Sequence, residues 1–190
     1  YGLMGLISTM ALLRREEPMT IVAPRGIQSI LGAMPGAEPD LLPFEINFVE
    51  LDEGFGRSVV LEDGEFTVTA RPLEHRTFAI GFRFEEHTRP GHLHPEQARA
   101  LGVPDYADFR RLKDGQPVTL DDGTAVEPEQ VLGPERPGIA VAYVPDTRPC
   151  EGGRLLARGA DLLYHEATFR AGLQQRAIEN GHSTAHAAVE

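Results

Sequence analysis

The sequence predicts a mixed α/β fold with a long segment inserted into it. Strand-like alternation recurs in the first half, as it does in antiparallel hairpins. Two later runs, IAVAYVPD at 139–146 and DLLYHEAT at 161–168, fit buried strands and flank a helical stretch. Between the two halves, residues 85–137 are rich in proline, glycine and charge and contain little core-forming sequence. Hairpins together with strand–helix–strand units indicate a mixed sheet, and a segment of this length without a core of its own is typical of an insertion.

Length and charge narrow the classes of protein that fit. The 190 residues suit one domain with a substantial core. Lys and Arg total 18 against 29 Asp and Glu, which gives a formal charge of −11. Such a charge argues against nucleic acid covering the whole surface, but it allows a local basic patch.

The single cysteine and the apolar first residues exclude further kinds of site and segment. The single cysteine, Cys150, excludes an intrachain disulfide and a cysteine-based zinc site, and we expect it to be a small packed side chain. The opening stretch GLMGLISTMALL is too short to span a bilayer and lacks the preceding basic residues of a signal peptide. We therefore expect a cytoplasmic protein with no membrane segment.

The first half of the chain divides into alternating helices and strands. The expected order is a helix at 3–15, a strand at 19–24, a helix at 27–34, a proline- and glycine-rich connector at 32–40, a strand at 44–51, a strand at 64–75 and a strand at 79–86. The strand at 64–75 is indicated by the alternation of Phe66, Val68 and Ala70, and it ends at His75. The run at 79–86 is its expected antiparallel partner.

The rest of the chain contains the inserted segment and the last core elements. In the insertion we expect a short helix, PEQARALG, and a hairpin, QPVTLDDGTAVEP, in which DDG is a strong turn signal. The core then resumes with the strand at 139–146, a helix at 153–160 and the strand at 161–168. A final helix is expected to open near His182.

Ionisable residues stand where the predicted strands end. They are His75, Asp146, the pair His165–Glu166, and His182 before the final helix. In layered α/β folds, ligands bind at strand ends, where loops gather polar groups over a rigid scaffold. Histidine and aspartate are common zinc ligands, and a carboxylate can bridge two metal ions.

Each of these residues also has a plainer interpretation. Asp146 could cap the next helix, because Asp is favoured at N-caps. His75 could be an ordinary exposed histidine, Glu166 could pair with an arginine, and Ser183 after His182 could begin a helix. Taken one at a time, these residues do not specify a metal site.

Two histidine pairs outside this set are weaker candidates. His92 and His94 have the spacing of a strand-borne ligand pair, but they lie between prolines in the insertion and are expected to form an exposed loop pair. His182 and His186 have helical i, i+4 spacing, but they lack the Glu of an H-E-x-x-H motif.

Taken together and in this order, the motifs resemble ribonuclease Z, the transfer-RNA 3′-processing endonuclease of the metallo-β-lactamase fold. The matching pieces are YGLMGLIST, IVAPRGI, PLEH at 72–75, LDDG in the insertion, GPERPG at 133–138, PDTRPC at 145–150, ADLLYHEATF at 160–169 and GHSTAHAA at 181–188. The resemblance covers essentially the whole chain. HEATF followed by HST, with DTR upstream, is its most specific part.

The resemblance implies a role for each strand-end residue. His75 would bind one of two zinc ions, and Asp146 would bridge both. Glu166 would orient His182, which would contact the scissile phosphate and help to protonate the leaving oxygen. The reaction implied is endonucleolytic removal of the 3′ trailer from precursor tRNA, with a 3′ hydroxyl left on the tRNA.

The same resemblance implies an architecture and partners. The fold would be a four-layer αββα sandwich, incomplete at both ends, with residues 1–84 and 138–190 as the core and 85–137 as a protruding substrate-binding arm. Arg110, Arg111 and Lys113 in that arm could hold RNA phosphates, although a solvated charged helix face is the plainer interpretation. A homodimer that acts on precursor tRNA in the cytoplasm is implied.

Part of the family's metal site has no counterpart in this sequence. The family's His-x-His-x-Asp-His motif would precede Tyr1, and its last ligand histidine would follow Glu190. Two ligands cannot complete a tetrahedral site. We therefore expect an interior fragment that is inactive alone. A related phosphodiesterase with a small substrate and a non-catalytic RNA-binding module are the alternatives.

Overall fold

The computed structural model describes residues 2–34 and 42–189 and has a mixed α/β fold. It divides into two compact units. The first contains residues 1–63, 67–84 and 140–190, and the second contains residues 64–66 and 85–139. The assignment of the second unit as a substrate-binding arm, like the four-layer sandwich, stays a prediction.

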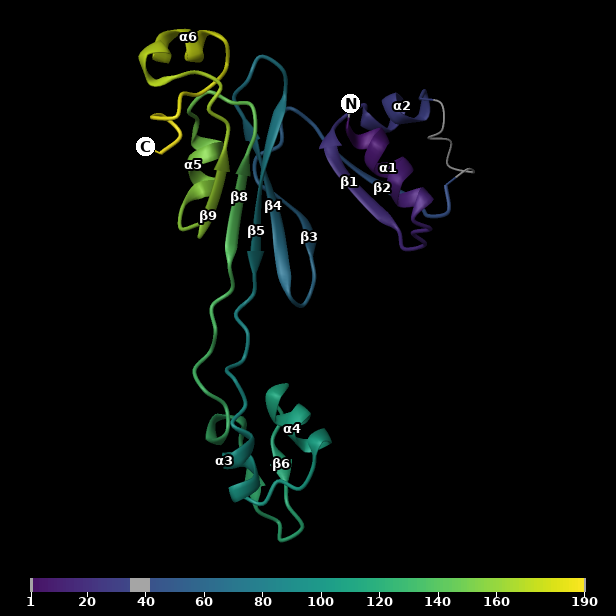
Figure 1. Cartoon of the computed structure of the whole chain (residues 1–190), viewed down its shortest axis with the longest axis vertical. Helices are drawn as coiled ribbons and strands as arrows, with labels where there is room; N and C mark the ends of the chain where they lie inside the picture. Colours follow the sequence, from purple (N-terminus) through teal and green to yellow (C-terminus); the bar gives the residue numbers. More distant parts are fainter. Residues whose placement is uncertain (1, 35–41, 190) are drawn as a thin grey trace. The chain divides into compact units, whose positions relative to one another are not determined.

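The N-terminal elements form a small α/β layer (Figure 1). They are α1 (Gly2–Leu12), β1 (Met19–Pro24), α2 (Ile27–Gly32) and β2 (Ile46–Leu51). β1 and β2 pair in parallel, from Met19 opposite Ile46 to Pro24 opposite Leu51. Ile7, Ile21, Leu31 and Phe44 are buried together, so the apolar faces of both helices pack on this strand pair. All four elements were expected from the sequence, whereas most of the predicted connector lies outside the described residues.

The first unit also contains a five-stranded sheet with the order β3-β4-β5-β8-β9. Its strands are β3 (Ser58–Glu62), β4 (Phe66–Leu73), β5 (Ala79–Glu86), β8 (Ala140–Val144) and β9 (Leu162–His165). β3 pairs antiparallel with β4, and β8 pairs in parallel with β9, which confirms the mixed sheet. β3 was not predicted, because SVVLE is a short edge strand with a register shift rather than a clean alternation.

One face of this sheet is covered by α5 (Glu151–Ala157). The buried cluster there contains Leu73 from β4, Ala142 and Val144 from β8, and Leu156 from α5. Cys150 is buried in the same cluster, with 6% of its surface exposed, so the prediction of a small packed side chain is confirmed.

The prediction that β9 is a buried strand is wrong. Leu162, Leu163 and Tyr164 are 59%, 37% and 62% exposed. β9 is the edge strand of the sheet among the described residues, and its tyrosine stacks on the half-exposed Tyr143 of β8 at 5.2 Å between ring centroids. An apolar run alone predicts a strand, but it does not say how many neighbours that strand has.

The second unit has its own small core, which the sequence did not predict. Its elements are α3 (Pro95–Ala100), α4 (Tyr106–Lys113), β6 (Val118–Thr119), β7 (Ala125–Val126) and the 3-10 turn η2 (Pro128–Gln130). The core consists of Ala98, Val103, Leu112, Val118, Val126 and Val131, all buried. These residues are spread over 98–131 and follow no helical or strand period, so no periodic apolar run reveals them in the sequence.

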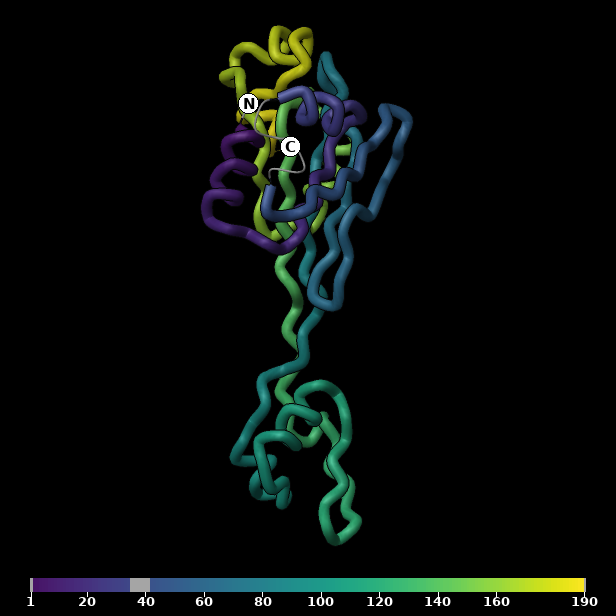
Figure 2. Tube along the Cα trace, turned by 90° about the vertical axis from the view of Figure 1, so that its right-hand side faces the viewer, coloured from purple at the N-terminus to yellow at the C-terminus, as the bar shows by residue number. Residues whose placement is uncertain are grey.

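Two predictions for the second unit are confirmed. The helix expected from PEQARALG is α3, and the expected hairpin pairs Val118 with Val126, with Gly123 at φ 86° in its turn. The segments that lead into and out of the unit run side by side (Figures 1 and 2), and bridges join Arg89 to Arg136 and Leu93 to Leu132.

The prediction of a final helix opening near His182 is wrong. The last described helix, α6 (Gln174–Glu179), follows the 3-10 turn η3 (Ala171–Leu173) and ends before His182. Gly181, at φ 76°, breaks the helical path, and residues 185–188 form turns. Within residues 2–34 and 42–189, no helix combines the length and the apolar character needed to cross a bilayer.

Candidate functional site

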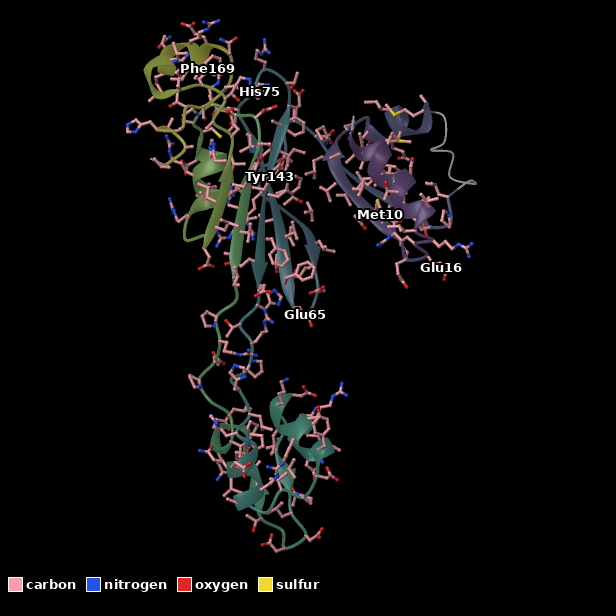
Figure 3. The ribbon with its side chains drawn as sticks, in the orientation of Figure 1. Met10, Glu16, Glu65, His75, Tyr143 and Phe169 are labelled. Atoms are coloured by element: carbon pink, nitrogen blue, oxygen red, sulfur yellow. The ribbon has the colours of Figure 1, made fainter. Side chains whose placement is uncertain are left out.

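The strand ends of the first unit bring the predicted site residues onto neighbouring loops. His75 lies two residues beyond β4, Asp146 two residues beyond β8, and Glu166 directly after β9. His182 follows α6. In Figure 3, His75 and Phe169 lie at the same end of the five-stranded sheet, and the Phe169 ring approaches the His182 ring at 6.0 Å between centroids.

Glu166 and His182 form a hydrogen-bonded pair that is largely buried. The Nδ1 of His182 lies 2.8 Å from the Oε1 of Glu166, and their side chains are 17% and 8% exposed. An ionised carboxylate only accepts hydrogen bonds, so Nδ1 carries the proton and Nε2 is left to face other groups. The arrangement fixes both the tautomer and the orientation of the imidazole.

Glu166 is held by backbone groups as well as by His182. Its Oε1 accepts from the N–H groups of Thr147 and Ser183, each at 3.1 Å, and its Oε2 accepts from the N–H of Thr168 at 2.8 Å. Burial by itself raises the pKa of Glu166. The hydrogen bonds from Thr168, Thr147 and His182 outweigh that effect and hold the pKa below its usual value.

The lowered pKa of Glu166 predicts a pH-dependent contribution to stability. The unfolded-state pKa of a glutamate is about 4.3, so the stabilisation is fully present above that pH and is lost as pH falls through the lower folded-state value. We expect Glu166→Gln to reduce the free energy of unfolding by about 1–3 kcal/mol at pH 7. Denaturant unfolding at pH 7 and at a pH below the folded-state value measures the difference from wild type. If wild type and Glu166→Gln differ in unfolding free energy by the same amount at both pH values, the stabilisation does not come from the lowered pKa of Glu166.

His75 is oriented by a backbone carbonyl. Its Nδ1 lies 2.7 Å from the carbonyl oxygen of Gly181, which can only accept, so Nδ1 is the protonated nitrogen and Nε2 offers a lone pair. Histidines that bind metals usually donate their other ring N–H in this way. The His75 and His182 rings meet edge to face, with 4.8 Å between centroids. An ordinary freely exposed histidine, the plainer interpretation, does not fit these contacts.

Gly181 allows this contact because it has no side chain. A Cβ there would lie 2.9 Å from Nδ1 of His75 and 3.2 Å from the N of Arg76, and its φ of 76° is in the left-handed region. Gly159, at φ 65°, has open space around its Cβ position and is the matched control. We expect Gly159→Ala to cost about 1–2 kcal/mol of unfolding free energy from backbone strain alone. Gly181→Ala should cost more and should shift the His75 ring signals in NMR spectra. Equal losses in both variants would show that the contact with His75 is unimportant.

Asp146 offers an exposed carboxylate beside this pair. One ligand atom each from Asp146, Glu166 and His182 lies within 4.8 Å of the others, a spacing at which they could hold a metal ion. The plainer interpretation of Asp146 as a helix cap is wrong, because α5 is capped by the Sγ of Cys150, which accepts from the N–H of Gly153. Both oxygens of Glu166 already accept hydrogen bonds. Asp146 is therefore the carboxylate of this group that is left to hold a cation.

Other histidines considered from the sequence have local contacts of their own. The Nδ1 of His165 lies 2.6 Å from the carbonyl oxygen of Glu166. His92 and His94 are exposed in the second unit, as expected, and the Nε2 of His92 lies 3.5 Å from the guanidinium of Arg136.

The three basic residues predicted to hold RNA phosphates lie on α4 in the second unit, and all are exposed. Arg110 is 4.0 Å from Asp114, and Arg111 is 3.8 Å from Asp108. Both arginines are solvent-exposed and both contacts are long, so the pairs are weak. These contacts leave the charges of Arg110, Arg111 and Lys113 available at the surface, and a role in binding stays a prediction.

Sequence reasoning missed two buried polar residues at the centre of the site. Thr147 and Ser183 are both 0% exposed, and the hydroxyl of Ser183 donates to the carbonyl oxygen of Thr147 at 2.8 Å. Each follows a predicted site residue, Asp146 or His182, and that adjacency was the available signal.

Comparison with known proteins agrees with the motifs over the whole chain. The ribonuclease Z of Salinibacter ruber is 56% identical over 190 residues, which are 100% of this chain and 59% of that protein. The ribonuclease Z of Geobacillus kaustophilus is 39% identical over 190 residues, and 61% of it is covered. The chain thus spans about three fifths of the length of these relatives. No family model matches it.

A solved structure has a similar fold. The crystal structure of the short form of human tRNase Z aligns with a TM-score of 0.60 at 21% identity. The alignment covers 99% of this chain and 61% of that one.

Proposed function

This chain is related to ribonuclease Z along its whole length, and from that premise we propose that it is part of a zinc-dependent endoribonuclease. The reaction proposed is removal of the 3′ trailer from precursor tRNA, with a 3′ hydroxyl left on the tRNA. The observation that carries the proposal is the buried Glu166–His182 pair, held beside the exposed carboxylate of Asp146.

The pair is suited to proton transfer at a phosphodiester. Hydrolysis breaks the bond between phosphorus and the leaving 3′ oxygen, and that oxygen needs a proton to depart as a hydroxyl. When it is protonated at Nε2, His182 can supply this proton, with its Nδ1 held by Glu166. The Glu166 carboxylate stays ionised throughout, because its pKa is held low, and it orients the ring as the reaction proceeds.

His75 and Asp146 would hold zinc through Nε2 and a carboxylate oxygen. Bound zinc would supply Lewis-acid stabilisation of the phosphate oxygens and would lower the pKa of a water molecule. Two side chains do not complete a tetrahedral site. We propose that further ligands complete the site and that residues 1–190 alone are inactive. The homodimer and the cytoplasmic location implied by the resemblance stay predictions.

The proposal is tested in a chimaera in which residues 1–190 replace the matched region of the Salinibacter ruber ribonuclease Z. Residues about 88–134 are replaced with a short linker. If this segment grips the substrate, its deletion should abolish cleavage of precursor tRNA and spare hydrolysis of a small chromogenic phosphodiester. Equal loss of both activities would contradict a role in gripping RNA.

A finer test concerns the three basic residues on α4. The triple variant Arg110→Ala, Arg111→Ala, Lys113→Ala should raise the KM for precursor tRNA. It should also reduce the slope of log affinity against log salt by about one for each phosphate that the variant no longer neutralises. Arg99→Ala is the matched control, because Arg99 is an exposed arginine on α3 of the same unit that is paired with Glu96 at 3.0 Å. If the triple variant and wild type have the same salt slope, the three residues do not bind RNA phosphates.

A further inference from the structure

We propose that Thr147 is the positioning residue that ties the loop of His75 to the loops of Glu166 and His182. This inference rests on the proposed function for its catalytic meaning, but its structural content can be tested without activity. Thr147 belongs to the loop after β8, next to Asp146. It makes hydrogen bonds to all three of the other loops through different atoms.

The Thr147 hydroxyl contacts the loop after β4. It is fully buried, accepts from the N–H of Glu74 at 3.1 Å, and lies 3.2 Å from the carbonyl oxygen of the same residue and 2.8 Å from that of Arg148. A hydroxyl has one proton, so it donates to one of these carbonyls while it accepts from Glu74. Glu74 directly precedes His75, so the hydroxyl fixes the backbone on which that histidine stands.

The Thr147 backbone contacts the other two loops. Its N–H donates to Oε1 of Glu166 at 3.1 Å, and its carbonyl oxygen accepts from the hydroxyl of Ser183 at 2.8 Å. Ser183 follows His182, and its own N–H donates to the same Oε1. The bonds to Glu166 and Ser183 therefore involve only backbone atoms of Thr147, whereas the bond to Glu74 involves only its side chain.

This division makes the two connections separable by mutation. Thr147→Val removes the hydroxyl but keeps the branched shape and both backbone bonds. The Glu74 N–H then loses a buried acceptor, and the segment that carries His75 is held to the loop after β8 only through the Glu74 carbonyl oxygen, which accepts from the N–H of Arg148 at 2.8 Å. The ring of His75 should lose its fixed hydrogen bond to Gly181, while the ring of His182 keeps Glu166 as its partner. Thr147→Ser restores the hydroxyl and should restore the wild-type geometry.

The matched control is Thr69→Val. Thr69 is a buried threonine in β4, with 8% of its surface exposed, and among the described residues its hydroxyl accepts only a long contact of 3.5 Å from Arg57. The substitution removes a buried hydroxyl from the same strand that leads to His75 without touching the loop. An effect of Thr147→Val that Thr69→Val does not share is therefore specific to the tie between loops.

The first experiment measures the protonation of each histidine ring nitrogen in residues 1–190 by long-range ¹H–¹⁵N NMR. The measurement is repeated on the chimaera, so that the result does not depend on the stability of the isolated chain. We expect Thr147→Val to reduce the Nδ1-protonated fraction of His75 and to leave His182 unchanged, with wild-type spectra for Thr147→Ser and Thr69→Val. Unchanged His75 signals in Thr147→Val, or equal changes in Thr69→Val, would overturn the proposal.

The second experiment measures kinetics and zinc content of the chimaera. We expect Thr147→Val to lower kcat by about 10–100-fold with little change in KM for RNA, and to lower zinc occupancy, with rescue by Thr147→Ser. If the chimaera does not cleave RNA but the NMR change is present, the proposed function fails and the role of Thr147 stands. If it cleaves RNA and Thr147→Val behaves as wild type, the role of Thr147 fails and the proposed function stands.

Discussion

Replacement of His182 with alanine should lower kcat for precursor tRNA by about 10²–10⁴-fold in the chimaera, the range expected for loss of a general acid. KM and zinc content should change little, because His182 is proposed to act on the leaving oxygen rather than to hold the substrate. The Nδ1 of the ring lies 2.8 Å from Glu166, so the whole pair is disabled by this single change. Single-turnover cleavage of an end-labelled precursor measures the effect.

The leaving group distinguishes proton donation from a structural effect. A p-nitrophenolate leaves readily without a proton, so hydrolysis of a p-nitrophenyl diester should fall much less than RNA cleavage in His182→Ala. His186→Ala is the control, because it removes an exposed histidine four residues further along the chain. Equal losses on both substrates would indicate that His182 shapes the site and does not donate the proton.

Replacement of Asp146 with asparagine should remove zinc and activity together. The carboxylate is exposed, lies within the group formed with Glu166 and His182, and has no helix-capping role that would explain it otherwise. Loss of a direct metal ligand should cost more than the 10–100-fold typical of residues that only support ligands, so we expect a fall of more than about 100-fold in kcat/KM. Zinc per mole of chimaera, by elemental analysis, is the deciding measurement.

The fold itself should survive this substitution, since Asp146 is exposed at the start of the loop beyond β8 and asparagine has nearly the same shape. Asp121→Asn, in the exposed hairpin turn of the second unit, provides the control for loss of one negative charge. A full complement of zinc in Asp146→Asn would exclude the aspartate as a ligand, whatever its effect on rate.

The parts of the site that could be predicted from the sequence are those tied to strand ends. The apolar runs before His75, Asp146 and Glu166 predict where each strand ends. The order of the motifs indicates that these strand ends lie in one region of the fold. The Glu166–His182 pairing followed from the resemblance alone, because sixteen residues separate them and no local pattern joins them.

Other features depend on tertiary packing that no local pattern encodes. The exposure of Tyr164 depends on whether β9 has one neighbouring strand or two. The local run DLLY would fit either case, so it does not predict the exposure. The core of the second unit is assembled from residues without a common period, such as Leu112 and Val131, far apart in the chain. The ties made by Thr147 join loops from four parts of the sequence, so its role became visible only once those loops were placed together.

Cleavage of a 3′-extended precursor tRNA by the chimaera in the presence of zinc tests the central claim most directly. We predict a single cut that leaves a 3′ hydroxyl on the tRNA, and no cleavage when His182 or Asp146 is replaced. An intact precursor in the chimaera, under conditions in which the unmodified Salinibacter ruber ribonuclease Z cuts it, would contradict the claim that residues 1–190 supply this part of a working active site.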